Sequence, residues 1–465
     1  MKNDRKPRVS KKGGGGGPGG ELPPVGKVFD GDQGGKPPPS DPGRLPFIPD
    51  QVILAGPGSL MGGIPGLKEI WRVELPALDA PAIDRVRNLM GGADRGGKVV
   101  DRLGAEPWVI AVFRILRDNQ SPVEWVKQIN ETTSLLADAN FITGDPHTPV
   151  GSPHTPVGSP CAGNGKRATP ADFQAQWVWQ GSHGIELTEP VQGQNGACRI
   201  GVFDTSPFPF DAWGAELDVH IPWAIPPLQL RVHCPEPVAI LPPPAGGLDI
   251  REHGLSVASL AHRVAPDSEV VLYRVLDNYA RGDTFTLIRS LASFTADTVR
   301  QRVGGVINLS LGISGSIDWW ALGLPDDIVI LRLVLAVAHS LGLVTVAAAG
   351  NDSWGLESPA PAQIPARYGF VIGTEASAYY DARACFSNAG HVAAPGCGVI
   401  AAVSMPPDGY GYWSGTSFAT PLVAGVAARH VPGAPSGPAA RDATLNSASA
   451  PQNASDPNFR VIKAH

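Results

Sequence analysis

The chain has 465 residues, of which 43% are hydrophobic and 17% charged, with a formal net charge of −6. This length allows two or three domains with a sizeable core. The slight acidic excess excludes the basic footprint of a nucleic-acid-binding protein. The longest apolar run, within residues 328–350, is interrupted by Arg332, His339 and Ser340, so we expect no membrane span.

The N-terminal segment, residues 1–45, contains 12 Gly and 8 Pro and almost no large apolar side chains. Such a composition cannot bury enough surface to offset chain entropy, so the segment is predicted to be a disordered tail. A basic cluster from Lys2 to Lys12 is followed by five glycines, Gly13 to Gly17, and not by the apolar stretch of a secretory signal. This absence favours a cytoplasmic protein, and export by another route is the alternative.

Residues 46–143 are predicted to form a small α/β domain. The expected strands are residues 51–54, 70–75, 98–103, 108–116 and 139–141, and the expected helices are residues 81–90 and 122–136. This alternation favours a small sheet with helices on one face, as in ferredoxin-like domains.

A proline-rich linker is predicted over residues 144–170. The seven residues from His147 to Pro153 are repeated from His154 to Pro160, and the repeat contains four prolines. Proline at this density forbids a helix and favours an extended, exposed chain. At the other end of the chain, residues 451–465 are predicted to be a C-terminal tail.

The remaining segment, residues 171–450, is predicted to be one large α/β domain. Short runs rich in Val and Ile alternate with helical segments, and the expected strands are residues 199–203, 269–276, 303–309, 342–348 and 370–373. Continuous apolar strands of this kind are typical of a mostly parallel sheet that is covered by helices on both faces, which gives three layers.

Five cysteines are spread through the chain without a Cys-x-x-Cys pair. The wide spacing does not match a zinc site, and no metal or other cofactor is expected. An odd number of cysteines indicates reduced thiols more readily than a disulfide framework.

Four polar residues lie at strand ends and helix starts, where the functional residues of parallel α/β sheets are usually found. Asp204 and Asn351 each follow an apolar strand, whereas His253 and Ser417 each begin a helical run. Taken singly, these residues are better explained without a function: Asp204 and Asn351 as turn residues, His253 as one of eleven histidines, and Ser417 as a helix cap. Together they supply what acyl transfer needs: a nucleophile, a base, a carboxylate that orients the base, and an oxyanion donor.

The segment from Gly415 to Pro421, Gly-Thr-Ser-Phe-Ala-Thr-Pro, closely resembles the serine motif of the subtilisin-like serine peptidases. The chain order Asp204, His253, Asn351, Ser417 is also that of the family, and residues 308–312 (Asn-Leu-Ser-Leu-Gly) resemble its substrate-binding strand. The resemblance covers roughly residues 171–450.

This resemblance implies a subtilisin-like fold and a serine endopeptidase that forms an acyl-enzyme without a metal. Ser417 would be the nucleophile, His253 the base and Asp204 the residue that orients it. The Asn351 side chain and the Ser417 backbone N–H would hold the oxyanion. Two alternatives have different sequence signatures. An inactive binding or scaffold protein on the same fold usually lacks one of these residues. An α/β-hydrolase places Ser before Asp and His, the reverse of the order here.

The small N-terminal domain resembles the propeptides of this family, chiefly over residues 98–116 and 122–141. A propeptide would assist folding, act as an intramolecular inhibitor and be released by a cut in the linker. The alternative is a permanent partner-binding domain.

The other expected partner is a protein or peptide substrate. The resemblance places it along Ser310, Leu311, Gly312, Ala349 and Gly350. These small groups predict a first pocket that admits bulky apolar side chains. Asp352 could instead attract a basic residue, although an exposed turn residue is the simpler interpretation.

Overall fold

The computed structural model describes residues 47–91, 106–116, 120–144, 167–180, 184–187, 198–208, 214–241, 249–313, 322, 326–404, 409–433, 436–450, 456 and 458–463. The predicted tail (residues 1–45), the predicted strand at residues 98–103 and the repeat within the linker lie outside the described residues. Within the described part of the chain, no helix combines the length and apolarity needed to cross a membrane.

The small domain is built around an antiparallel sheet in the order β4-β1-β3-β2. Its elements are β1 (Phe47–Pro57), the short helix η1 (Gly58–Leu60), β2 (Leu67–Glu74), α1 (Ala80–Leu89), β3 (Trp108–Ile115), α3 (Pro122–Thr132) and β4 (Leu136–Thr143). Both helices begin with proline in the first turn and a capping side chain before it, Asp79 for α1 and Ser121 for α3.

Helix α3 is shorter than the sequence predicts, because it ends at Thr132 and not at Leu136. The hydroxyl of Thr133 donates to the carbonyl of Ile129 and accepts from the N–H of Leu135, which closes the last turn. The following residues are then available for β4, which is buried along its whole length. A side-chain bond in the turn therefore outweighs the apolar periodicity that favoured a longer helix.

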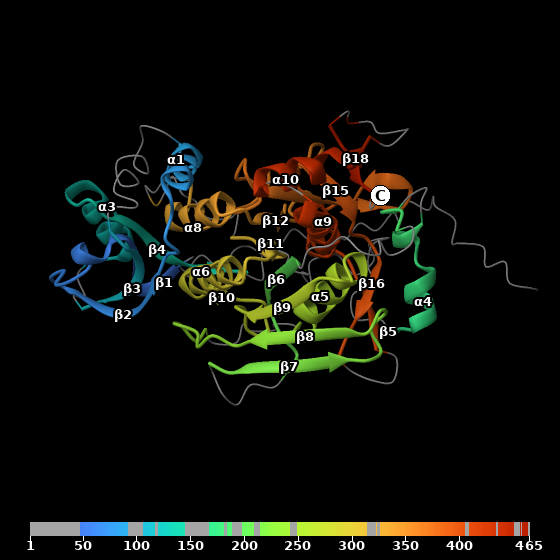
Figure 1. Ribbon diagram of the computed structural model, residues 1–465, viewed down its shortest axis with the longest axis horizontal. Helices are drawn as coiled ribbons and strands as arrows, with labels where there is room; N and C mark the ends of the chain where they lie inside the picture. Colours follow the sequence, from blue (N-terminus) through green and yellow to red (C-terminus); the bar gives the residue numbers. More distant parts are fainter. Residues whose placement is uncertain are drawn as a thin grey trace, which may run out of the picture. The chain divides into compact units, whose positions relative to one another are not determined.

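The large domain has one sheet in the order β18-β19-β15-β13-β12-β11-β6-β9-β8-β7 (Figure 1). Its strands are β6 (Cys198–Asp204), β7 (Glu216–Ile221), β8 (Leu228–His233), β9 (Glu269–Arg274), β11 (Gly304–Leu309), β12 (Val344–Ala348), β13 (Ile372–Ala378), β14 (Ala382–Arg383, beside β13), β15 (Val392–Pro395), β18 (Ala448–Ser449) and β19 (Val461–Ile462). The central pairs, from β8 through to β15, are all parallel. The expected mostly parallel sheet is thereby confirmed.

Helices cover both faces of this sheet, as expected for three layers (Figure 1). The helices are α4 (Pro170–Ala175), α5 (His253–Val264), α6 (Thr284–Gln301), α8 (Val329–Ser340), α9 (Thr416–His430) and α10 (Gly437–Asn446). Alternate strand residues face opposite layers: Val306 of β11 belongs to the apolar core under α5 and α9, whereas Ile307 belongs to the core under α6 and α8. A small sheet joins β5 (Arg167–Ala168), β16 (Val399–Ala402) and β17 (Tyr410–Trp413).

The cysteines differ from the sequence-based expectation at one position. Cys198 and Cys234 are free and buried, and burial raises the pKa of both thiols to about 12, which keeps them unreactive. Cys397, in contrast, is disulfide-bonded. The expectation of reduced thiols is therefore wrong for Cys397.

One buried histidine should make the fold sensitive to acid. His339 of α8 is 7% exposed, and burial, together with Arg441 and Arg85, lowers its pKa to about 4. The folded protein therefore leaves His339 neutral at a pH where the unfolded chain binds a proton, since an ordinary histidine has a pKa near 6.5. Above about pH 6.5, protonation of His339 does not affect the free energy of unfolding. As the pH falls from there towards 4, this free energy decreases by ~1.4 kcal/mol per pH unit, up to about 3 kcal/mol in total.

Urea unfolding at pH 7.5 and pH 4.5 checks this expectation. The loss of unfolding free energy between the two pH values should be smaller in His339→Leu than in the wild type, because leucine cannot take up a proton. Equal losses in the two proteins would mean that His339 does not contribute to acid sensitivity.

Candidate active site

Three strand ends and two helix starts meet at one edge of the large sheet. Asp204 is the last residue of β6, and Asn351 lies three residues beyond the end of β12. Because β6, β11 and β12 are neighbouring parallel strands, their carboxyl ends lie at the same edge. His253 is the first residue of α5 and Ser417 the second of α9, and these two helices pack against each other.

Asp204 and His253 form a buried pair. The two side chains are fully buried, and Nδ1 of His253 lies 2.7 Å from Oδ1 of Asp204. The same carboxylate oxygen accepts a bond from the N–H of Thr205 at 2.7 Å, which fixes the carboxylate. Carboxylate contact at Nδ1 favours the tautomer that carries its proton there and leaves Nε2 basic.

The loop after β6 is also fastened to the start of α5. The hydroxyl of Thr205 donates to the carbonyl of Arg251 at 2.9 Å and accepts from the N–H of Gly254 at 3.0 Å. A Cβ at position 254 would lie 2.1 Å from the carbonyl oxygen of Thr205, so only glycine allows this approach. These contacts hold the imidazole of His253 at a set distance from Asp204.

Aromatic rings enclose the imidazole of His253. The ring of Phe418 lies 4.9 Å from it, and that of Trp413 lies 6.1 Å away, both edge to face. Nε2 of His253 is buried and has no hydrogen-bond partner among the described residues. A base with a desolvated, unoccupied nitrogen is ready to accept a proton from a neighbouring hydroxyl.

Ser417 lies in the first turn of α9, directly before Phe418. Its Oγ donates to the carbonyl of Ser310 at 3.1 Å, and the Ser310 hydroxyl donates to the Ser417 carbonyl at 2.7 Å. In this structure the hydroxyl of Ser417 therefore donates to Ser310 and not to His253. Rotation about χ1 would redirect Oγ, and hydrogen bonds to catalytic groups often tighten only when substrate is bound.

Asn351 lies beside the loop that precedes Ser417. Its Oδ1 accepts from the N–H of Thr416 at 2.8 Å, and its Nδ2 is 3.4 Å from where a Cβ on Gly415 would stand. The backbone N–H of Ser417 belongs to the first turn of a helix, where N–H groups lack partners within the helix. The Ser417 nitrogen lies 3.8 Å from the same Cβ position, and an amide N–H and a backbone N–H near one point are suitable donors for an oxyanion.

The predicted substrate-binding residues border this edge as well. Ser310, Leu311 and Gly312 continue β11, and Ala349 and Gly350 continue β12. Sequence analysis singled out neither of the aromatic neighbours of His253 nor Thr205. Their positions next to the motif residues were the only available signal, because ring packing depends on how β17, α5 and α9 meet. Among the described residues, no cluster of three or more His, Cys, Asp or Glu side chains could hold a metal ion.

Comparison with known proteins finds a family similar to part of this chain. Residues 243–460 match the subtilase family. The resemblance to subtilisin-like serine peptidases is therefore confirmed. His253, Asn351 and Ser417 lie within the matched region, whereas Asp204 precedes it.

Curated subtilases are similar over about a third of the chain. A thermophilic serine proteinase of Bacillus sp. (strain AK1) is 32% identical over 194 residues, which are 39% of this chain and 43% of the relative. Subtilisin of Bacillus pumilus is 34% identical over 168 residues, which are 36% of this chain and 54% of that protein. The chain thus spans about half the length of these relatives. A solved cold-adapted subtilisin-like serine proteinase has 22% identity and a TM-score of 0.42, covering 63% of this chain and 98% of its own.

Proposed function

We propose that the protein is a serine endopeptidase that hydrolyses peptide bonds through Asp204, His253 and Ser417. The observation that carries this proposal is the buried Asp204–His253 pair, whose Nε2 is unpartnered at the sheet edge where Ser417 begins α9. The match to the subtilase family supports the same reaction. An acid–base pair beside a hydroxyl is the arrangement that acyl transfer needs.

In this mechanism, Ser417 Oγ attacks the scissile carbonyl while His253 Nε2 takes the hydroxyl proton. Asp204 accepts the Nδ1–H bond and stabilises the imidazolium that forms. The oxyanion lies against Asn351 Nδ2 and the Ser417 N–H. His253 then protonates the leaving amine, and water releases the acyl group by the same steps in reverse order.

A small fluorophosphonate tests this proposal, because it reacts with an activated serine hydroxyl and carries no peptide side chain. The wild-type protein should be labelled at Ser417, as located by peptide mass mapping, and His253→Ala should not be labelled. An unlabelled wild-type protein that is folded would favour the alternative, an inactive binding protein on the same fold.

The small N-terminal domain is proposed to act as an intramolecular inhibitor within a precursor. The end of β4 pairs antiparallel with β10 (Gly282–Asp283), and the N–H of Gly144 donates to the carbonyl of Gly312 at 3.0 Å. Gly312 belongs to the predicted substrate-binding segment. A chain that leaves the small domain along this segment occupies backbone groups that a substrate would need.

The same strand also supports a role in folding. The Oδ2 of Asp138 accepts from the N–H of Ile330 at 2.7 Å, and Oδ1 of Asn140 accepts from the N–H of Phe285 at 3.0 Å. Both acceptors cap helices of the large domain, since Ile330 and Phe285 lie in the first turns of α8 and α6. Side chains of β4 therefore accept hydrogen bonds from backbone N–H groups at the starts of two helices.

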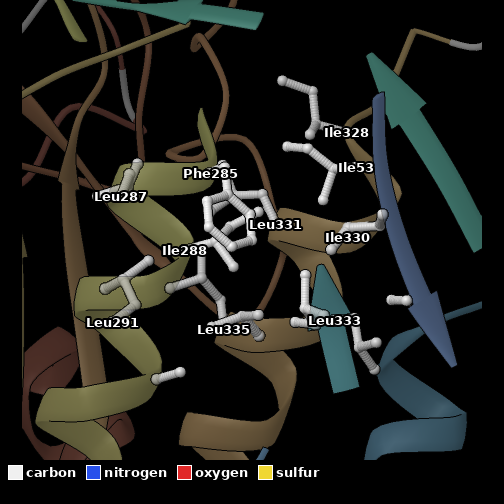
Figure 2. Close-up of a cluster of buried hydrophobic side chains, with 14 of the residues drawn as sticks. Ile53, Phe285, Leu287, Ile288, Leu291, Ile328, Ile330, Leu331, Leu333 and Leu335 are labelled. Carbon is white, nitrogen blue, oxygen red and sulfur yellow. The ribbon is translucent and has the colours of Figure 1, made fainter. Parts of the chain in front are cut away.

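An apolar core joins the small sheet to these two helices (Figure 2). Ile53 of β1 points towards Ile328 and Ile330, at the start of α8, and α6 contributes Phe285 and Ile288 to the same cluster. All of these side chains are fully buried. Removing the small domain would expose this surface, so we expect the large domain to fold poorly without it.

A further inference from the structure

A segment distant in sequence from the predicted walls of the first pocket, residues 363–364, lies across both walls. Strands β11 and β12 are paired as far as Leu309 and Ala347. The segments that follow these two strands form the predicted walls of the first pocket. Residues 363–364 bond to both walls: the N–H of Gln363 donates to the carbonyl of Ala349 at 2.9 Å, and Ile313 pairs with Ile364. This segment therefore bridges the two walls.

The side chain of Gln363 occupies the space between the walls. A Cβ on Gly312 would lie 2.2 Å from Oε1 of Gln363, and a Cβ on Gly350 would lie 2.9 Å from its Cδ. One side chain is thus in contact with a glycine on each wall, and it is only 4% exposed. The volume that two glycines would leave open is filled by an amide.

Hydrogen bonds hold this amide in place. Nε2 of Gln363 donates to Oδ2 of Asp352 at 2.6 Å, and the same oxygen accepts from Nδ2 of Asn388 at 2.8 Å. Asn388 also donates to the carbonyl of Ala349 at 3.2 Å, which ties the network to the pocket wall. To move Gln363 aside, a substrate would have to break a charge-assisted bond within a nearly buried network, and an apolar side chain offers no replacement.

We propose that Gln363 determines specificity by filling the first pocket, so that the protein cleaves after small residues such as alanine and serine and rejects aromatic and large aliphatic ones. The inference rests on the proposed function. It replaces the expectation from sequence that small wall residues admit bulky apolar side chains. Asp352, the other candidate determinant, acts by holding the amide and not by contacting a basic side chain.

Two peptide nitroanilides that differ only in alanine or phenylalanine before the scissile bond test this proposal. The ratio of their kcat/KM values is measured within each protein, so that a general loss of activity cancels. Wild-type protein should favour alanine by about tenfold or more, and Gln363→Gly should shift the ratio towards phenylalanine by roughly 100-fold. Gln363→Leu, with a similar volume, should keep the preference for alanine, and thermal melting confirms that each variant is folded.

The outcomes separate this inference from the proposed function. Fluorophosphonate labelling of Ser417 together with a wild-type preference for phenylalanine, or with an unchanged ratio in Gln363→Gly, would overturn the inference alone. A ratio that shifts equally in Gln363→Leu and Gln363→Gly would show that polarity and not volume decides, and would overturn it too. No labelling and no turnover of either nitroanilide would overturn both.

Discussion

Ser417→Ala is expected to lower turnover of peptide substrates by about 10⁶-fold, a magnitude known from subtilisin itself. Alanine removes the attacking oxygen but leaves the Asp204–His253 pair and the Asn351 amide in place, so the remaining turnover relies on attack by water assisted by the oxyanion donors. The preparation should also stay at its full mass of 48.6 kDa, whereas we expect the wild type to shorten itself. Nitroanilide kinetics and intact-protein mass spectrometry measure the two effects.

A matched control for this variant is Ser59→Ala, which makes the same chemical change at an exposed position in the small domain. It should process and turn over substrate like the wild type. Because Gly144 bonds to Gly312, we expect the wild-type cut to fall beyond residue 144, and sequencing of the new N-terminus locates it. Full activity in purified Ser417→Ala would show that the nucleophile is misassigned.

Asp204→Asn is expected to reduce kcat by about 10⁴-fold with little change in fold. The substitution preserves the shape of a fully buried side chain, but its amide can donate a hydrogen bond to Nδ1 of His253. The imidazole then carries its proton on Nε2, the atom that must accept the proton of Ser417. Because the geometry is nearly unchanged, the loss of kcat is attributed to the changed tautomer of His253.

Steady-state kinetics at pH 8, combined with thermal melting, measure this effect. Asp218→Asn is the control, since among the described residues the side chain of Asp218 on β7 pairs with Arg231 alone, and it is 83% exposed. That variant should retain wild-type kcat, because an exposed ion pair contributes little. A loss smaller than about tenfold in a folded Asp204→Asn variant would contradict the role of Asp204 in orienting His253.

Much of the architecture follows from local sequence. The apolar runs that became β6, β9, β11 and β12 are buried on both faces, and this pattern belongs to central parallel strands. The end of α3 was not predictable from periodicity, because a threonine side chain in the turn decides it. The disulfide at Cys397 was likewise hidden, since spacing along the chain says nothing about which thiols approach each other.

The sequence by itself determined the proposed chemistry: Asp204, His253, Asn351 and Ser417 stand out as candidates because acyl transfer needs these residue types, at strand ends and helix starts, in a fixed order. Only the tertiary structure decided how that proposed chemistry would be controlled. Asp138 and Asn140 of the small domain cap helices of the large one, and Gln363 reaches the pocket from a separate segment. The physical reason is that catalysis depends on local residue identity, whereas caps and pocket volume arise from contacts between segments distant in the chain, which leave no periodic signal.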